Sequence, residues 1–111
     1  MFTDICPMTI EVKGHLRFVR TIKSLNDASL QRKIDTFLHS AKAGEIRGDY
    51  IKNRPYPTRY LKDGVSNLYR YPIFDYRLIY TIVTQKETKT YLILDFLTHK
   101  EHDVIFGYHT T

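Results

Sequence analysis

Apolar residues occur at every second position in two neighbouring segments, and this alternation limits the possible folds more than any other feature. The first segment covers residues 69–73, and the second is Tyr76–Thr84. A two-residue period is typical of a strand with one buried face. Phe74 and Asp75 separate the segments and predict a tight hairpin turn. Pro72 cannot donate a ladder hydrogen bond, so we expect an edge position or a bulge there.

Two more strands are predicted outside this hairpin. Tyr91–Leu97 is almost entirely apolar, which is typical of a central strand, and it follows a polar turn at Gln85–Lys89. Near the N-terminus, Thr9–Val12 alternates between Pro7 and Gly14 and predicts a short strand.

Between the first strand and the hairpin, apolar residues recur at helical spacing in two consecutive segments. They are Leu16, Val19, Ile22 and Leu25, followed by Leu30, Ile34, Phe37, Leu38 and Ala41. Asn26 and Asp27 suit the N-terminal cap of the second helix, and Gly44 suits its C-terminal end. We predict a single α+β domain over residues 1–111 with the element order β-α-α-β-β-β. Two helices of the N-terminal half should pack on one side of a twisted, mainly antiparallel sheet.

The composition indicates a soluble chain with an anionic partner. The formal net charge is +5, and either a nucleic acid or an acidic protein would complement it. Cys6 is the sole cysteine, so no disulfide framework can form and a reducing compartment is expected. No stretch approaches the ~20 apolar residues of a membrane span, and no secretory signal is visible. We therefore expect a cytoplasmic protein without a membrane partner.

The polar segment of residues 45–64 is basic and contains several tyrosines. Its cations include Arg54, Arg59 and Lys62. Cations interleaved with aromatic rings suit a single-stranded nucleic acid, because phosphates and unstacked bases are then both recognised. A solvated loop that covers the sheet edge is the alternative interpretation.

Protonatable side chains gather where the chain leaves its last predicted strand, at Thr98–Asp103. Arg77 lies among apolar residues on a nearby strand, where it must either pair with an acid such as Asp75 or Asp95 or bind an anion. An arginine close to histidines suits the binding and cleavage of a phosphodiester. His99 and His102 could also share a zinc ion, but a fourth ligand and a cysteine pair are missing, so neither a metal nor a cofactor is predicted.

Several segments, in this order, resemble the RelE/ParE superfamily of bacterial and archaeal toxins. They are Leu68–Tyr71 (LYRY), Asp75–Tyr80 (DYRLIY), Leu94–Asp103 (LDFLTHKEHD) and Phe106–Tyr108 (FGY). The last two are similar to the RelE-like and HigB-like ribonuclease branch. The resemblance implies the toxin of a type II toxin–antitoxin pair. Such toxins typically enter the ribosomal A site and cleave messenger RNA without a metal, and a cognate antitoxin neutralises them.

The resemblance also implies roles for individual residues. Arg77 matches the arginine that contacts the scissile phosphate, and Arg70 and Lys62 match further basic positions. His99, Lys100 and His102 supply the C-terminal catalytic group. Tyr108 is a candidate for catalysis or base stacking, although Phe106 stands near the family's tyrosine position. The resemblance therefore leaves the general base unassigned. Asp95, inside an apolar strand, should orient a histidine or pair with an arginine.

Two other functions agree with the same sequence. A ParE-like inhibitor would bind DNA gyrase and cleave nothing, and an inactive relative would serve as a binding module. For the toxin, an antitoxin segment is expected to fold on its apolar surface, by helix-in-groove docking or by strand addition. The sequence leaves open whether the free protein is a homodimer.

Overall fold

The computed structural model describes residues 8–107, and within them five strands form one sheet. The strands are β1 (Thr9–Gly14), β2 (Asp49–Tyr50), β3 (Tyr69–Ile73), β4 (Tyr76–Gln85) and β5 (Thr88–Thr98). Their order across the sheet is β1-β5-β4-β3-β2. β1 runs parallel to β5, and the other neighbouring pairs are antiparallel.

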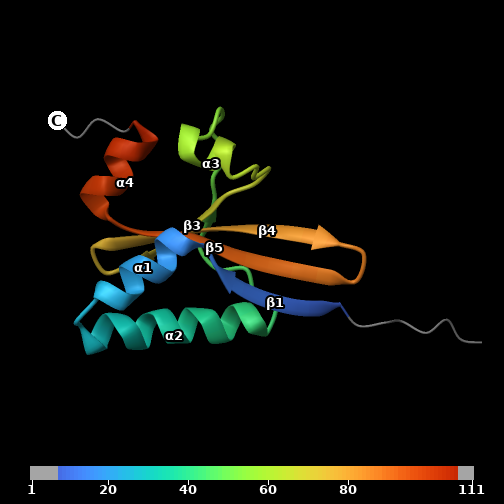
Figure 1. Ribbon diagram of the computed structural model, residues 1–111, viewed down its shortest axis with the longest axis horizontal. Coiled ribbons are helices and arrows are strands. Elements are labelled where there is room, and N and C mark those ends of the chain that lie inside the picture. The colour runs from blue at the N-terminus through green and yellow to red at the C-terminus, as the bar shows by residue number, and fades with distance from the viewer. Residues whose placement is uncertain (1–7, 108–111) are drawn as a thin grey trace, which may run out of the picture.

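Two long helices cover one face of the sheet. α1 (Leu16–Ser24) and α2 (Ala28–Lys42) lie on the lower side in Figure 1. The core on this face joins their apolar side chains to those of β4 and β5, including Phe18, Ile34, Phe37, Tyr80 and Tyr91. The predicted packing of two helices on a mainly antiparallel sheet is therefore confirmed.

The ends of α2 follow from its sequence. The Asp27 side chain accepts hydrogen bonds from the backbone N–H groups of Ser29 (2.9 Å) and Leu30 (3.1 Å), which caps the helix. Gly44, at φ 87°, follows the last helical turn, and Glu45 N–H donates to Ser40 O (3.0 Å) in a Schellman motif. Both predicted helix ends are confirmed.

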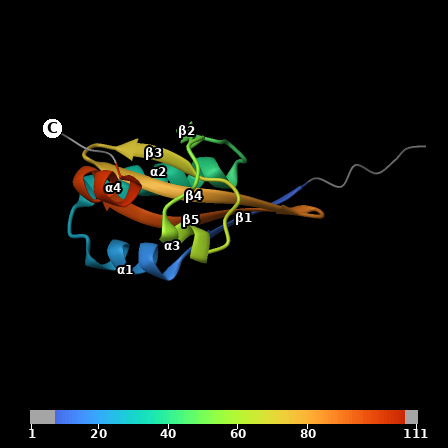
Figure 2. The same ribbon diagram turned by 90° about the horizontal axis from the view of Figure 1, so that it is seen from above.

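The opposite face of the sheet carries a second layer that the sequence did not predict. It contains α3 (Thr58–Lys62), α4 (His99–Phe106) and the loop that precedes α3. Figure 2 shows α3 and α4 in front of the sheet and α2 behind it. Tyr60 of α3 is completely buried and packs in a second core with Ile79 and Leu94. The expectation of one helical layer was therefore incomplete, because a five-residue helix is too short to show a helical period.

β2 pairs only with Tyr69 and Arg70, so β3 has no outer neighbour at Pro72 within the described residues, as an edge position requires. The prediction of which α1 side chains are buried was partly wrong. Phe18 is buried, whereas Leu16, in the first turn and predicted on the apolar face, is 57% exposed. None of the helices in residues 8–107 is long and apolar enough to cross a membrane.

Candidate functional site

A cleft of about 350 Å³ lies where α4 passes over β3 and β4. This hollow is called the cleft below, and it is lined by Asp49, Arg70, Pro72, Arg77, His99, His102 and Asp103. The structure thus brings Arg77 and Arg70 together with both predicted histidines. Sequence reasoning did not assign Asp49 or Asp103 to the site.

Strand register places the two arginines of the cleft. Arg70 is paired with Ile79, and Pro72 is paired with Arg77, in the antiparallel β3–β4 ladder. Cross-strand partners point to the same face, so Arg70 and Arg77 are diagonal neighbours on the face that α4 covers. Asp49 joins them because β2 pairs it with Arg70.

Helix capping places the histidines beside these arginines. Thr98 and Glu101 form a capping box: Thr98 Oγ1 accepts from Glu101 N–H (3.1 Å), and Glu101 Oε1 accepts from Thr98 N–H (2.9 Å). His99 N–H donates to Asp75 O (2.7 Å), which ties the start of α4 to the β3–β4 turn. The two histidines are three residues apart, so both project from the same side of α4.

The buried imidazole of His102 has a defined tautomer. Its Nδ1 lies 3.0 Å from Asp103 Oδ1, and its Nε2 lies 3.0 Å from Arg70 Nη1. A guanidinium can only donate, so Nε2 must accept and Nδ1–H must donate to the carboxylate. Burial lowers the pKa of His102 below its ordinary value, and the charges of Arg70 and Arg77 lower it further against the opposing effect of Asp103. His102 is therefore neutral in this arrangement.

His99 differs from His102 in being accessible. Its side chain is 49% exposed, and its Nε2 lies 3.3 Å from Asp103 Oδ2. The two oxygens of Asp103 therefore contact one histidine each. A half-exposed imidazole in a cleft can reach a bound substrate, whereas the 3% exposed ring of His102 cannot.

Arg77 is held by the backbone. Its Nη1 donates to Tyr76 O (2.9 Å) and to Phe74 O (3.4 Å). Among the residues that the structure describes, no ion pair joins Arg77 to Asp75 or Asp95, the two alternative partners considered from the sequence. Carbonyl groups orient a guanidinium without cancelling its charge, so Arg77 keeps its attraction for an anion.

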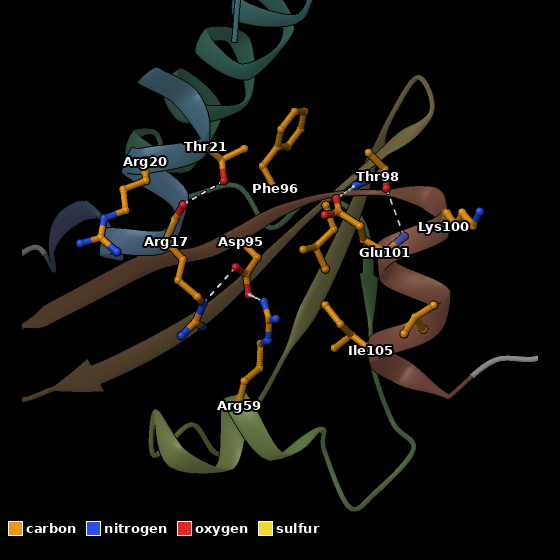
Figure 3. Close-up of a pocket in the computed structure, with 12 residues that line it drawn as sticks. Arg17, Arg20, Thr21, Arg59, Asp95, Phe96, Thr98, Lys100, Glu101 and Ile105 are labelled. Carbon is orange, nitrogen blue, oxygen red and sulfur yellow. Dashed lines mark hydrogen bonds and ion pairs between the residues drawn. The ribbon is translucent and has the colours of Figure 1, made fainter. Parts of the chain in front are cut away.

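Asp95 has the structural role that the sequence favoured. It accepts hydrogen bonds from Arg17 Nε (3.0 Å) and Tyr60 Oη (2.8 Å), and it pairs with Arg59 Nη1 (3.2 Å), as Figure 3 shows for the two arginines. Burial and the nearby Asp95 raise the pKa of Tyr60, so its hydroxyl stays protonated. Arg59 is thus anchored away from the cleft.

The structure does not bring the remaining predicted residues into the cleft. Lys100 projects from another side of α4 and lines a larger groove (Figure 3). Arg54 donates to Ser66 O (2.8 Å) and lies over the ring of Tyr56, while Lys62 is exposed in the last turn of α3. Tyr108 lies outside the described residues.

Two further observations concern the chemistry of this region. Phe106 stacks on His102, with ring centroids 4.6 Å apart, so the aromatic residue near the family's tyrosine position packs beneath the cleft. Within residues 8–107, no three His, Cys, Asp or Glu side chains converge as metal ligands would.

Comparison with known proteins identifies the fold. No family model and no curated protein match this sequence. Among solved structures, a chain in the crystal structure of the archaeal RelE–RelB complex from Pyrococcus horikoshii OT3 matches with a TM-score of 0.52 and 27% identity. The match covers 82% of this chain and 96% of that chain. This match supports the resemblance to RelE-like toxins that the sequence indicated. The predicted α+β fold, with two helices on a mainly antiparallel sheet, is therefore confirmed as RelE-like, and β2, α3 and α4 add to it.

Proposed function

We propose that this RelE-like toxin is a metal-independent endoribonuclease that cleaves messenger RNA at the ribosome and is neutralised by a cognate antitoxin. The observation that carries the proposal is the shared cleft of Arg77, Arg70 and the accessible His99. A phosphate-binding cation and a proton-transfer group within one cleft are the two requirements of metal-free RNA cleavage.

The reaction uses the 2′-hydroxyl of RNA as its nucleophile. As O2′ attacks phosphorus, the O2′ proton leaves, the P–O5′ bond breaks, and the departing 5′-oxygen takes up a proton. The products are a 2′,3′-cyclic phosphate and a 5′-hydroxyl. His99 is the group that can transfer a proton, because its imidazole is accessible and an imidazole can both accept and donate a proton.

The two arginines supply charge stabilisation. The planar guanidinium of Arg77 can bind two phosphate oxygens at once, and Arg70 lies beside it on the same face of the sheet. Negative charge accumulates on these oxygens in the transition state, so fixed cations lower the barrier. Lys100, Arg54, Arg59 and Lys62 lie outside the cleft, and we assign them no direct part in the chemistry.

Purified protein should be incubated with translating ribosomes, and the 5′ ends of the message should be mapped. We expect Arg77→Ala to lower the cleavage rate by about 10²–10³-fold and His99→Ala by about 10²–10⁴-fold. Arg32→Ala is the matched control, because Arg32 is exposed on α2 at the other face of the sheet. Intact message would refute the proposal, and inhibited DNA supercoiling in parallel would favour the gyrase inhibitor.

The antitoxin is proposed because the structural relative was solved as a RelE–RelB complex. A groove of about 650 Å³ between α1 and α4 offers it a docking surface that includes apolar Ile105 and the cations Arg20 and Lys100 (Figure 3). Val104, 74% exposed at this groove, suits the apolar face of an acidic helix.

Binding to the product of the adjacent small gene tests this partner. Val104→Glu should weaken binding by at least about tenfold, because it places a charge against the apolar helix face. Arg32→Ala should leave the affinity unchanged. Absence of measurable affinity for the wild-type toxin would refute the partner without affecting the ribonuclease assay.

A further inference from the structure

The Asp103–His102–Arg70 chain lies below the accessible part of the cleft. Asp103 Oδ1 accepts from His102 Nδ1–H, and His102 Nε2 accepts from Arg70 Nη1, each over 3.0 Å. The ring between them is 3% exposed and stacks on Phe106. Such a ring cannot touch a reacting oxygen, so any contribution of His102 must act through a neighbour.

We propose that Asp103 is a positioning residue that holds the Arg70 guanidinium at the cleft through the tautomer of His102. The carboxylate accepts only, so it keeps the proton of the neutral ring on Nδ1 and the lone pair on Nε2. With the opposite tautomer, an Nε2–H would face the N–H groups of Arg70, and the contact would be lost. The proposal rests on the proposed ribonuclease function, in which Arg70 helps to bind the phosphate.

Asp103 also touches the proposed proton-transfer residue, and the experiment must separate the two contacts. Its Oδ2 lies 3.3 Å from His99 Nε2. Loss of the carboxylate could therefore act through His102 on Arg70 or through His99 on proton transfer. Glutamine in place of His102 distinguishes these routes, because its amide oxygen can accept from Arg70 but has no tautomer for Asp103 to set.

The test is a double-mutant cycle measured as kcat for message cleavage. We expect Asp103→Asn to lower kcat about 10²-fold, since a misplaced binding group has an effect of this size. His102→Gln alone should retain most of the wild-type kcat. The double variant with Asp103→Asn should have nearly the same kcat as His102→Gln alone. Glu101→Gln, which removes another carboxylate from α4 but keeps its capping oxygen, should match the wild type.

The ¹⁵N shifts of the His102 ring provide a second measurement that needs no activity. The wild type should show a protonated Nδ1 and an unprotonated Nε2, and Asp103→Asn should change this pattern. Among the residues that the structure describes, the charged groups that face the ring include Asp103 on its own helix, Arg70 on β3 and Arg77 on β4. At a pH low enough to protonate Nε2, the contact with Arg70 should be lost.

Three results would overturn the positioning role. One is a His102→Gln variant as inactive as His102→Ala, which would show that the ring itself transfers protons. Another is a double variant in which Asp103→Asn lowers kcat as much in the His102→Gln protein as in the wild type, which would show that Asp103 acts through His99. The third is a wild-type ring protonated on Nε2. If the wild type cleaves no RNA, the proposed function fails, and the ring shifts still decide whether Asp103 sets the tautomer.

Discussion

The carboxylate of Asp95 joins α1, α3 and β5, and its replacement by asparagine should therefore lower the free energy of unfolding. Asp95 is 3% exposed and receives three donors, from Arg17, Arg59 and Tyr60. An asparagine of nearly the same shape keeps one oxygen but loses the charge and turns an NH₂ group toward these donors. The two guanidinium groups then lose a buried counter-charge.

The magnitude follows from the contacts that remain. Removing one partner of a buried ion pair costs about 3–5 kcal/mol. Arg17 keeps its pairing with Asp63, at 2.6 Å, and Arg59 is 37% exposed, so water replaces part of its interaction. We therefore expect the low end of the range, about 3 kcal/mol.

Urea unfolding followed by circular dichroism measures this effect. With a slope of roughly 2 kcal/mol per molar urea, the midpoint should fall by about 1.5 M at an unchanged slope. Asp63→Asn is the matched control, because Arg17 then keeps Asp95 and the loss should be smaller. Equal midpoint shifts for the two variants would refute the central role of Asp95.

Three other changes test separate features of the fold. Because burial lowers the pKa of His102, only the unfolded chain takes up that proton in the interval between this lowered pKa and pH ~6.5. The unfolding free energy should therefore fall by up to about 1.4 kcal/mol per pH unit on acidification, and His102→Gln should flatten this slope in urea titrations. Gly48 has φ 87°, and in Gly48→Ala the new Cβ would collide with the Arg70 carbonyl, so the urea midpoint should fall strongly. Gly64 has φ 77° but faces open space, so Gly64→Ala should lower the free energy of unfolding by only about 1–2 kcal/mol. Asp27→Ala should cost about 1 kcal/mol in the same assay through the lost helix cap.

The sequence predicted the elements whose periodic pattern extends over several turns or strand positions. The β3–β4 hairpin also placed Arg70 and Arg77 correctly, because alternation and register fix which face each side chain occupies. β2 has two residues and α3 has five, so neither shows a period. Asp49 was missed for this reason: only the pairing of β2 with β3 brings it to the cleft.

The C-terminal group shows a second limit of sequence interpretation. His99, Lys100 and His102 were grouped because they are close in sequence. Once these residues form a helix, positions three and four apart share a face, which selects His99, His102 and Asp103. Lys100, about 100° around the helix from His99, lines the other groove. The signal that could have identified Asp103 was its i, i+4 spacing from His99.

The basic residues of this chain divide according to what holds them. Arg17 and Arg59 contact the buried Asp95, so much of their charge is cancelled within the fold. Arg77 is oriented by two carbonyl oxygens, and contacts of this kind do not cancel a charge. Net charge counts all of these arginines equally. An arginine that is fixed by neutral groups is already ordered and still attracts a phosphate, so binding costs it less entropy than a mobile surface lysine. The cleft, rather than the total charge, is therefore the reason to expect an RNA substrate.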